Sequence, residues 1–305
     1  MEYFLAKPVI IHEIGQRANQ EDNFYPSANS LTEGQRFFIL CDGMGGHESG
    51  EVASSTVCEC MGKYISEHLA SGELFSNRML EGALLAAYDG LDTKDNPDAL
   101  KKMGTTMTFL MLHQEGVTVA HIGDSRIYQF RPGIKRPIFK SRDHSLVNDL
   151  IRLGEMTEEQ AKTSKNKNVI TRAMQPNQES RSHADIALLT DVKSGDWFYM
   201  CSDGMLEQMD DDELGQILTD GKMTNEEKKD MLIDKTAGNR DNHTAFLIHI
   251  LEVIDDETDN ATLEASTNKM RIDKPYKKLI KKIGIVISLL LLVTAVWWLV
   301  SHFVL

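Results

Sequence analysis

Apolar positions along the chain recur with two periods, one typical of strands and one typical of helices. Short apolar runs predict strands, whereas apolar residues spaced three or four apart predict helices. The strand candidates are Arg36 to Cys41, Thr105 to Leu112, Val117 to Ile122, Arg126 to Phe130, Trp197 to Cys201 and Thr244 to Leu251. The helix candidates are Gly50 to Ala70, Ser76 to Leu91, Asp211 to Leu218 and Asn225 to Thr236. Strands from both halves of the chain, separated by helical pairs, indicate an α+β domain with two sheets covered by helices.

A longer apolar stretch, Ile283 to Leu305, lies in the C-terminal part of the chain. It contains no Asp, Glu, Lys or Arg, and a helix of this length, at about 1.5 Å per residue, crosses a bilayer core of roughly 30 Å. Trp297 and Trp298 suit one membrane interface, and the lysines that precede the stretch suit the other. The pattern predicts a transmembrane helix. The alternative is a buried helix of the globular domain, which is disfavoured because long core helices usually keep a polar face.

These patterns divide the chain into three predicted parts. Residues 1–254 form one domain, residues 255–282 form a linker that is polar and then basic, and residues 283–305 form the transmembrane helix. The charge follows this division, since seven basic residues and a single acid, Asp273, lie from Lys269 onward in a chain of net charge −13. The residues before Lys269 hold 26 basic and 45 acidic side chains, a net charge of −19. That charge disfavours electrostatic binding of nucleic acid.

The basic residues before the apolar stretch also predict an orientation. Because Lys and Arg favour the cytoplasmic side of a membrane, we expect a single-pass protein whose catalytic domain lies in the cytoplasm. The N-terminus lacks the basic and then apolar segment of a secretory signal. The four cysteines, Cys41, Cys58, Cys60 and Cys201, lack the spacing of a zinc site and are expected to be buried, reduced thiols.

Carboxylates are the candidate chemical groups because of where they lie. Six of them lie beside the ends of apolar strand candidates or near the N-terminus: Glu21, Asp22, Asp42, Asp124, Asp203 and Asp241. Carboxylates gathered in this way repel one another unless a cation neutralises them. Mg²⁺ and Mn²⁺ prefer such oxygen ligands, and two ions about 4 Å apart can generate hydroxide and hold a phosphoryl group. A single Asp-Gly pair is also a common turn, so the ordered set carries the prediction.

The motifs around these carboxylates resemble those of a known family, the PPM phosphatases, which are metal-dependent, type 2C-like serine/threonine protein phosphatases. The resemblance spans residues 8–251. The matching motifs, in the family's order, are 17–22 (RANQED), 42–47 (DGMGGH), 50–54 (GEVAS), 103–106 (MGTT), 123–126 (GDSR), 143–145 (DHS), 202–204 (SDG) and 241–242 (DN). The 42–46 segment is most similar to bacterial members. The resemblance implies a four-layer α-β-β-α sandwich of two antiparallel sheets flanked by helices, acting on phosphoserine and phosphothreonine proteins opposite a cognate kinase.

The resemblance also implies which residues hold metal ions directly. Asp42 would bridge two Mn²⁺ or Mg²⁺ ions, and the Gly43 carbonyl would complete one of the two sites. Asp203 and Asp241 would bind one of those ions. Oxygen ligands of this kind fit hard divalent cations.

Further roles that the resemblance implies concern water, phosphate and a third ion. Glu21 and Asp22 would hold metal-bound waters, with Asp22 the more important for geometry. Asp124 would join Asp203 in a third, weaker metal site, and its alternative role is to cap a strand turn. Arg17 would bind the substrate phosphate, because a planar guanidinium suits phosphate oxygens better than a lysine does. The alternative for Arg17 is a surface salt bridge.

The implied reaction is direct attack on phosphorus by a metal-bridged hydroxide, without a phosphoenzyme, while the metals and Arg17 offset the charge of the phosphoryl oxygens. The chain has no Cys-x5-Arg motif, which excludes a cysteine-nucleophile phosphatase. Met44 stands where eukaryotic relatives carry a His proposed as general acid, so the leaving group must be protonated by metal-bound water or another group. Gln20 stands where many bacterial members have Asn, a polar change that we expect to be tolerated.

The remaining polar residues have ordinary interpretations. His47 at a helix start and His121 within a strand are expected to be structural. Residues 145–169 resemble the family's flap region. That segment contains three lysines, Lys162, Lys165 and Lys167. They fit a solvated basic loop or, alternatively, a surface that holds phosphopeptides.

The leading hypothesis is a membrane-tethered phosphatase of bacterial type. One alternative is a catalytically weak PPM-like scaffold or regulator, which is disfavoured because binding alone would not need every metal position. A second alternative is a phosphatase of an anti-sigma-factor antagonist in a regulatory cascade. It is disfavoured because no regulatory or sensory domain is visible in the chain.

Overall fold

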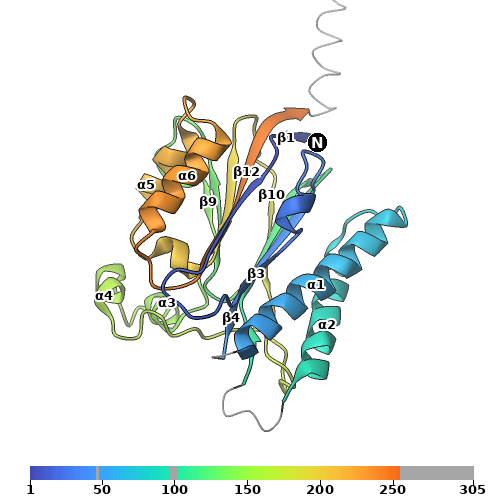
Figure 1. Ribbon diagram of the computed structural model, residues 1–305, viewed down its shortest axis with the longest axis vertical. Coiled ribbons are helices and arrows are strands. Elements are labelled where there is room, and N and C mark those ends of the chain that lie inside the picture. Colours follow the sequence, from blue (N-terminus) through green and yellow to red (C-terminus); the bar gives the residue numbers. More distant parts are fainter. Residues whose placement is uncertain (46–47, 97–101, 255–305) are drawn as a thin grey trace, which may run out of the picture. The chain divides into compact units, whose positions relative to one another are not determined.

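The computed structural model describes residues 1–45, 48–96 and 102–254, which contain two antiparallel sheets with helices on their outer faces (Figure 1). The first sheet has the order β1-β12-β11-β8-β9, with β2 also paired to β12. Its strands are β1 (Glu2–Leu5), β2 (Val9–Glu13), β8 (Arg126–Phe130), β9 (Phe139–Lys140), β11 (Trp197–Cys201) and β12 (His243–Ile254).

The second sheet has the order β10-β7-β6-β4-β3, with the short β5 paired to β4. Its strands are β3 (Asp22–Tyr25), β4 (Phe37–Met44), β5 (Gly104–Thr105), β6 (Met107–His113), β7 (Gly116–Ile122) and β10 (Asp185–Leu189). The helices are α1 (Glu48–Ala70), α2 (Asn77–Lys94), α3 (Leu146–Arg152), α4 (Glu158–Thr163), α5 (Asp211–Thr219) and α6 (Asn225–Thr236), with the 3₁₀ turns η1 (Ala28–Ser30) and η2 (Asp203–Leu206).

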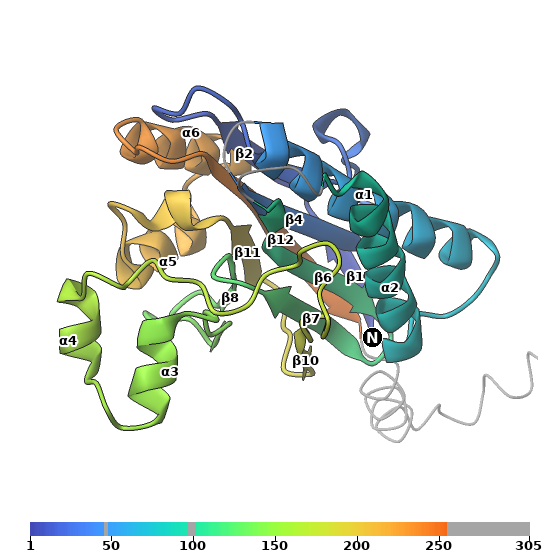
Figure 2. The same cartoon turned by 90° about the horizontal axis from the view of Figure 1, so that it is seen from below.

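Alternation along single strands builds the layers. On β4, Phe37 and Ile39 pack with α1 and α2, whereas Phe38 and Leu40 face the other way, into the space between the sheets. On β11, Trp197 packs with α5 and α6, and Phe198 faces the same inter-sheet core as Phe38. Figure 2 shows α1 and α2 on one side of the strands and α5 and α6 on the other. Each helical pair therefore covers one sheet, and the predicted arrangement of two helix-flanked antiparallel sheets is confirmed.

Local signals set the helix boundaries. The Ser76 hydroxyl accepts a hydrogen bond from the Met79 amide at the start of α2. Thr224 and Glu227 form a reciprocal capping box at the start of α6, which begins at the predicted residue. Such caps satisfy amides that have no partner within the helix.

Among the described residues, five strands were not predicted by the sequence analysis: β1, β2, β3, β9 and β10. β3 begins with the polar pair Asp22 and Asn23, and β10 is a short edge strand whose four apolar residues remain exposed or partly exposed, so neither has the pattern of a buried strand. The first sheet also needs β1 and β2 to pair along β12, which a local pattern does not show.

Two predictions concern residues beyond the described ones. His47 and residues 255–305, with the expected linker and transmembrane helix, lie outside them. Among the helices of the described ranges, none has both the length and the apolar character needed to cross a bilayer. The cysteines are all free, and Cys41, Cys58 and Cys201 are buried as expected, whereas Cys60 is partly exposed.

Candidate metal centre

One face of β4 points into the gap between the sheets, and an aspartate lies on that face. Asp42 follows Phe38 and Leu40 on the same face of the strand, just beyond the inter-sheet core. The strand pairing places Asp22 of β3 directly opposite Asp42, and Asp22 is only 2% exposed. Like charges directly opposite each other on neighbouring strands destabilise a sheet. Packing of the sheet alone therefore does not explain why these two carboxyl groups lie opposite each other.

Three further aspartates reach the same end of the sandwich from other strands. Asp203 begins η2 immediately after β11, Asp241 lies just before β12, and Asp124 lies in the turn between β7 and β8. That turn depends on Gly123, whose φ of +104° lies in a region that L side chains rarely adopt, and whose added Cβ would lie 2.6 Å from Thr106 Cγ2. The four sequence-predicted strand-end aspartates thus converge as expected.

The main chain around Asp42 is held by neighbours from other elements. The Asp42 amide donates to Thr106 Oγ1 at 2.9 Å, and Thr105 Oγ1 donates to the Asp42 carbonyl at 2.8 Å. A Cβ on Gly43 would lie 2.2 Å from the Gly50 carbonyl oxygen. Only glycine at position 43 allows the first turn of α1 to approach β4 so closely.

Burial and mutual repulsion raise the pKa values of these carboxyls. Burial raises the pKa of Asp22 to about 7, and the charges of Asp203 and Asp241 add to the shift. Burial, followed by the charge of Asp203, likewise raises the pKa of Asp124 to about 7. The pKa of Asp42 is raised well above its ordinary value by burial and then by the charge of Asp22. Each carboxyl resists ionisation in the presence of the others. A bound cation would therefore stabilise the ionised form of the group.

Two oxygens in this group lack any hydrogen-bond donor. Within the described residues, the buried atoms Asp22 Oδ1 and Asp124 Oδ1 have no hydrogen-bond partner. Buried polar atoms are nearly always satisfied, so an unsatisfied carboxylate oxygen needs an explanation. An acidic, oxygen-only donor set with unpartnered oxygens is what Mg²⁺ or Mn²⁺ requires. The residues present therefore fit divalent cations.

Arg17 lies at the exposed side of the group. Its Nη2 donates to Asp241 Oδ2 at 2.6 Å, and the Arg17 side chain is 54% exposed. This hydrogen bond, more than the charges of Asp241, Glu21 and Asp42, raises the pKa of the guanidinium. The ion pair that was the alternative expectation for Arg17 is therefore present, and the guanidinium also remains open to solvent.

Two supporting residues lie in motifs that the sequence analysis quoted but to which it gave no role. Ser202 Oγ donates to Asp22 Oδ2 at 2.7 Å. The Asn242 side chain accepts from the Glu21 amide at 2.7 Å and donates to the carbonyls of Ile14 and Asn19. Asn242 therefore fixes the loop that carries Arg17. Its position beside Asp241 was the only signal in the sequence.

A cavity of about 710 Å³ opens beside the carboxylates. Arg17, Asp124, Asp203 and Asp241 line it together with Lys167, from the segment that resembles the family's flap. Its size is within the range of ordinary ligand pockets. Lys167, one of the three flap lysines, thus lies beside this cavity.

A separate group of potential metal donors consists of His121, His144 and Asp185, whose donor atoms lie within 4.8 Å of one another. His144 Nδ1 accepts from the Gly123 amide at 3.1 Å, which leaves the proton on Nε2, 3.2 Å from Asp185 Oδ2. His121 Nε2 lies 2.8 Å from the Arg142 carbonyl, to which it donates. These nitrogens are engaged within the protein. The group therefore supports the Gly123 turn rather than a metal ion, and His121 is structural as expected.

Comparisons with known proteins identify a matching family model and similar proteins. The family model for protein phosphatase 2C matches residues 12–264. The chain is 31% identical over 240 residues to a putative protein phosphatase 2C-type of Streptococcus pyogenes, covering 78% of this chain and 94% of that protein. It is 30% identical over 239 residues to serine/threonine phosphatase stp of Listeria monocytogenes, covering 76% of this chain and 90% of that protein.

Solved structures agree with these sequence relatives. The crystal structure of the Mycobacterium tuberculosis serine/threonine phosphatase PstP/Ppp superposes with a TM-score of 0.68 at 27% identity, covering 81% of this chain and 99% of that one. A structure of the PstP catalytic domain in complex with two manganese ions has a TM-score of 0.65, at 27% identity, covering 82% of this chain and 100% of that one.

Proposed function

The chain belongs to the protein phosphatase 2C family and is therefore a serine/threonine protein phosphatase; we propose that it hydrolyses these phosphate esters with hydroxide generated at a divalent metal centre. The observation that carries the proposal is the set of buried carboxylates that raise one another's pKa values, with oxygens on Asp22 and Asp124 that have no partner among the described residues. The manganese ions in the PstP complex support Mn²⁺ or Mg²⁺ as the cation.

In this proposal two ions share one central ligand. Asp42 would hold both ions, the Gly43 carbonyl would complete one site, and Asp203 and Asp241 would bind one ion directly. Asp42 suits this role because Asp22 lies opposite it and the charges of Asp22 and Asp203 both act on it. When bound, such ions generate hydroxide from water and neutralise charge on the phosphoryl group.

The other acids complete the proposed centre from its edges. Glu21 and Asp22 hold waters of the centre, and the Ser202 hydrogen bond fixes the orientation of the Asp22 carboxylate. Asp124 and Asp203 form a third, weaker site, for which the unpartnered Oδ1 of Asp124 is the supporting observation. The charge of Asp203 is the largest electrostatic contribution to the raised pKa of Asp124.

Arg17 binds the substrate phosphate. Its present partner, Asp241, is itself a proposed metal ligand, so neutralisation of Asp241 weakens that ion pair and frees N–H groups for phosphate. The guanidinium then offsets charge on the phosphoryl oxygens as the ester bond breaks.

A metal-dependent assay tests the enzyme proposal. The chain should hydrolyse p-nitrophenyl phosphate and a phosphothreonine peptide with Mn²⁺, and excess chelator should abolish both activities. Activity that persists after chelation and dialysis would contradict the metal mechanism. No activity with Mn²⁺ or Mg²⁺ would instead favour the scaffold alternative.

We also propose that the domain is tethered to the cytoplasmic face of a membrane, where it acts on phosphoproteins made by a serine/threonine kinase. The support is the apolar stretch 283–305 with lysines before it, each worth about 1 kcal/mol near anionic headgroups. The full chain should pellet with membranes and resist alkaline carbonate, whereas a chain ending at Asp255 should stay in the supernatant. Recovery of the full chain in the supernatant would contradict the tether.

A further inference from the structure

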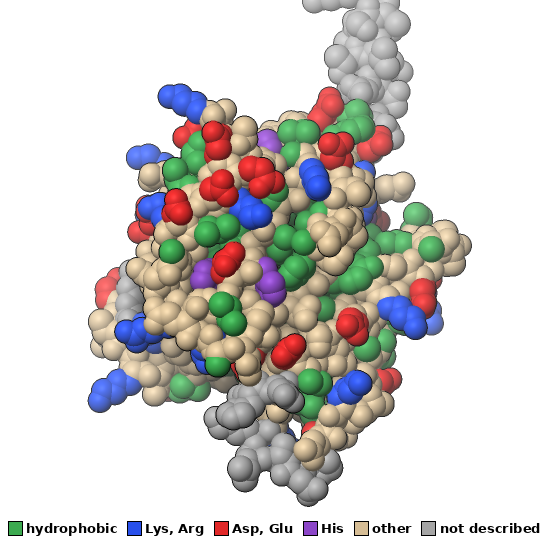
Figure 3. Space-filling view, in the orientation of Figure 1, with side chains coloured by type: hydrophobic (Ala, Val, Ile, Leu, Met, Phe, Trp, Pro, Cys, Tyr) green, Lys and Arg blue, Asp and Glu red, His purple; other side chains and the backbone are tan. Residues whose placement is uncertain are grey.

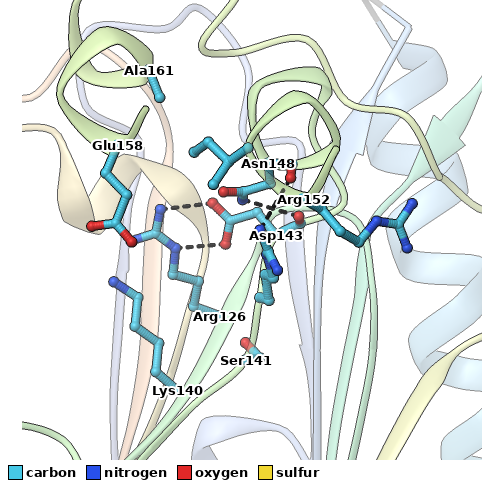
Figure 4. Close-up of a pocket in the computed structure, with 10 residues that line it drawn as sticks. Arg126, Lys140, Ser141, Asp143, Asn148, Arg152, Glu158 and Ala161 are labelled. Atoms are coloured by element: carbon cyan, nitrogen blue, oxygen red, sulfur yellow. Dashed lines mark hydrogen bonds and ion pairs between the residues drawn. The ribbon is translucent and has the colours of Figure 1, made fainter. Parts of the chain in front are cut away.

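A second cavity, of about 760 Å³, lies next to the first one. The two cavities share four lining residues: Arg126, Asp143, Asn148 and Ala161. Figure 4 shows Arg126 and Asp143 facing each other through two parallel contacts, Nε to Oδ1 and Nη2 to Oδ2, each 2.7 Å long. This bidentate ion pair forms part of the wall between the cavities. A chain bound with one residue at the metal centre can therefore place a neighbouring residue in the second cavity.

The second cavity is cationic in an acidic protein. Four basic side chains line it, Arg126, Lys140, Arg142 and Arg152, against two acidic ones, Asp143 and Glu158. They come from β8, β9, the segment before α3, α3 itself and the first residue of α4. Figure 4 shows Lys140 and Glu158 on the same side of the cavity as Arg126. Because residues 1–268 carry a net charge of −19, a lining with excess positive charge is an exception that needs a reason.

Among the four basic side chains of the lining, Arg142 differs in having no ion pair within the described residues. Arg126 is paired with Asp143, Lys140 Nζ with Asp211 and Arg152 with Asp149. The Arg142 guanidinium donates to the Asn148 carbonyl at 3.1 Å, and no ion pair of the described residues includes it. It is also exposed, so its charge is available to a ligand. A backbone carbonyl orients the guanidinium without neutralising it.

Figure 3 gives the surrounding charge on one face of the molecule. Acidic side chains, with basic ones among them, cover the upper part of that face, whereas the charged side chains at its lower left, where Figure 1 has α3 and α4, are mostly basic. The positive charge of the second cavity is thus local. A ligand drawn to it must carry negative charge close to the residue that is being dephosphorylated.

We propose that the second cavity binds an acidic side chain of the phosphoprotein substrate, close in sequence to the phosphorylated residue, through Arg142. This inference rests on the proposed phosphatase function and adds a substrate class to it. The carboxylate of a Glu or Asp would accept hydrogen bonds from the guanidinium, while the Arg126–Asp143 pair separates it from the carboxylates of the metal centre. Such a contact sets specificity by charge complementarity across the cavity.

The test uses the full-length chain with Mn²⁺ and pairs of phosphothreonine peptides that differ only by Glu or Gln at one position before or after the phosphothreonine. The measured quantity is the ratio of kcat/KM for the Glu peptide to that for the Gln peptide. For at least one position the wild-type ratio should be on the order of fivefold, the effect of one partly exposed charge pair. The preference should appear in KM and should shrink as salt is added.

Matched variants identify the residue. Arg142→Gln should bring the ratio close to one, Arg142→Lys should retain part of it, and Arg136→Gln should leave it unchanged. Arg136 is an exposed cation on the connection between β8 and β9 that does not line the cavity, so it controls for net charge. A wild-type ratio near one at every position, or an equal loss in Arg136→Gln, overturns the inference. Wild-type chain that cleaves none of the peptides contradicts the proposed function instead.

Discussion

The two ends of strand β11 each carry a buried aspartate, and the surroundings of the two differ. Asp196, just before the strand, is completely buried and accepts four hydrogen bonds. Gln129 Nε2 donates at 2.8 Å, Arg131 at 2.7 and 2.8 Å through Nε and Nη2, and the Lys193 amide at 2.9 Å. The chain itself provides the cation that Asp196 needs. Asp196 is therefore a structural ion-pair partner.

Asp203, just beyond the other end of the strand, has acids for neighbours. Burial and the charge of Asp241 raise its pKa, and Asp22 and Asp124 beside it have unpartnered oxygens. Arg17 is the cation that pairs with this group, through Asp241 at the exposed side. The comparison teaches that burial alone does not mark a functional carboxylate. A buried acid matched by an arginine stabilises the fold, whereas buried acids without a matching internal cation are arranged for one from outside.

Loss of the central carboxylate should have the largest effect. Asp42→Asn keeps the side-chain volume but removes the charge that we propose bridges two ions, so kcat should fall by about 10³-fold or more. The metal-free variant should be at least as stable as metal-free wild type, because one repelling charge is gone. Steady-state kinetics measure the fall in kcat, and thermal unfolding in chelator measures the stability of the metal-free variant. Activity within tenfold of wild type would sink the bridging role.

The same substitution at the other end of β11 should have the opposite consequence. Asp196→Asn removes the buried charge that accepts four hydrogen bonds and leaves Arg131 with the exposed Asp191 as its remaining charged partner, which should cost about 2–4 kcal/mol of unfolding free energy. The folded fraction should keep its kcat, since Asp196 lies at the end of the strand away from the carboxylate group. Urea unfolding and kinetics well below the transition measure both quantities. A selective loss of kcat with normal stability would break the comparison.

Arg17→Ala tests the cation at the rim of the acidic end. A contact made in both the bound substrate and the transition state contributes mainly to binding, so KM for phosphopeptides should rise about tenfold and kcat should fall less. The matched control is Arg240→Ala, an arginine that lines the same cavity without an ion pair to Asp241 among the described residues. An unchanged KM for Arg17→Ala, or an equal rise for Arg240→Ala, would contradict the phosphate contact.

A histidine near the Asp196 end should give the smallest effect, a loss of stability in acid. His249 stacks on Trp197 with ring centroids 4.1 Å apart, and burial, with a smaller contribution from Lys228, lowers its pKa to about 4. Between about pH 6.5 and 4 the unfolded chain binds a proton that the folded chain does not, so stability falls as pH falls. Allowing for its partial exposure, the loss should be about 1–2 kcal/mol. His249→Gln should remove that pH dependence, and an unaltered dependence in urea titrations would refute the assignment.

The sequence predicted the helices and strands whose formation depends on local patterns. β8, β11 and α6 carry strong local patterns, and their boundaries agree with the prediction. β3 and β10 were missed because both are short edge strands, defined mainly by their pairing with β4 and β7. An edge strand with one solvated face gives a weak pattern.

The candidate site was likewise predicted only in part from the sequence. The order of the acidic motifs predicted that Asp42, Asp203 and Asp241 would come together, because each lies beside the end of an apolar strand candidate; in the structure β4 continues through Asp42 to Met44. The contacts of Ser202 with Asp22 and of Asn242 with Glu21 join residues 180 and 221 positions apart, and no periodicity reports such contacts. Strand position alone does not distinguish Asp196 from Asp203, since both are aspartates beside one apolar strand; the motif 202–204 selected Asp203 in the sequence analysis. The partners that the fold supplies give the physical difference between the two.

The central claim is that the carboxylates at the Asp203 end bind divalent ions, and calorimetric titration of Mn²⁺ into the metal-free full-length chain tests it most directly. The account predicts at least two ions per wild-type chain, a rise in the unfolding temperature on binding, and loss of the tight sites in Asp42→Asn. Asp196→Asn should bind as wild type does at temperatures where it is folded. A wild-type chain that takes up no Mn²⁺, or an Asp42→Asn variant that binds it equally well, would contradict the account.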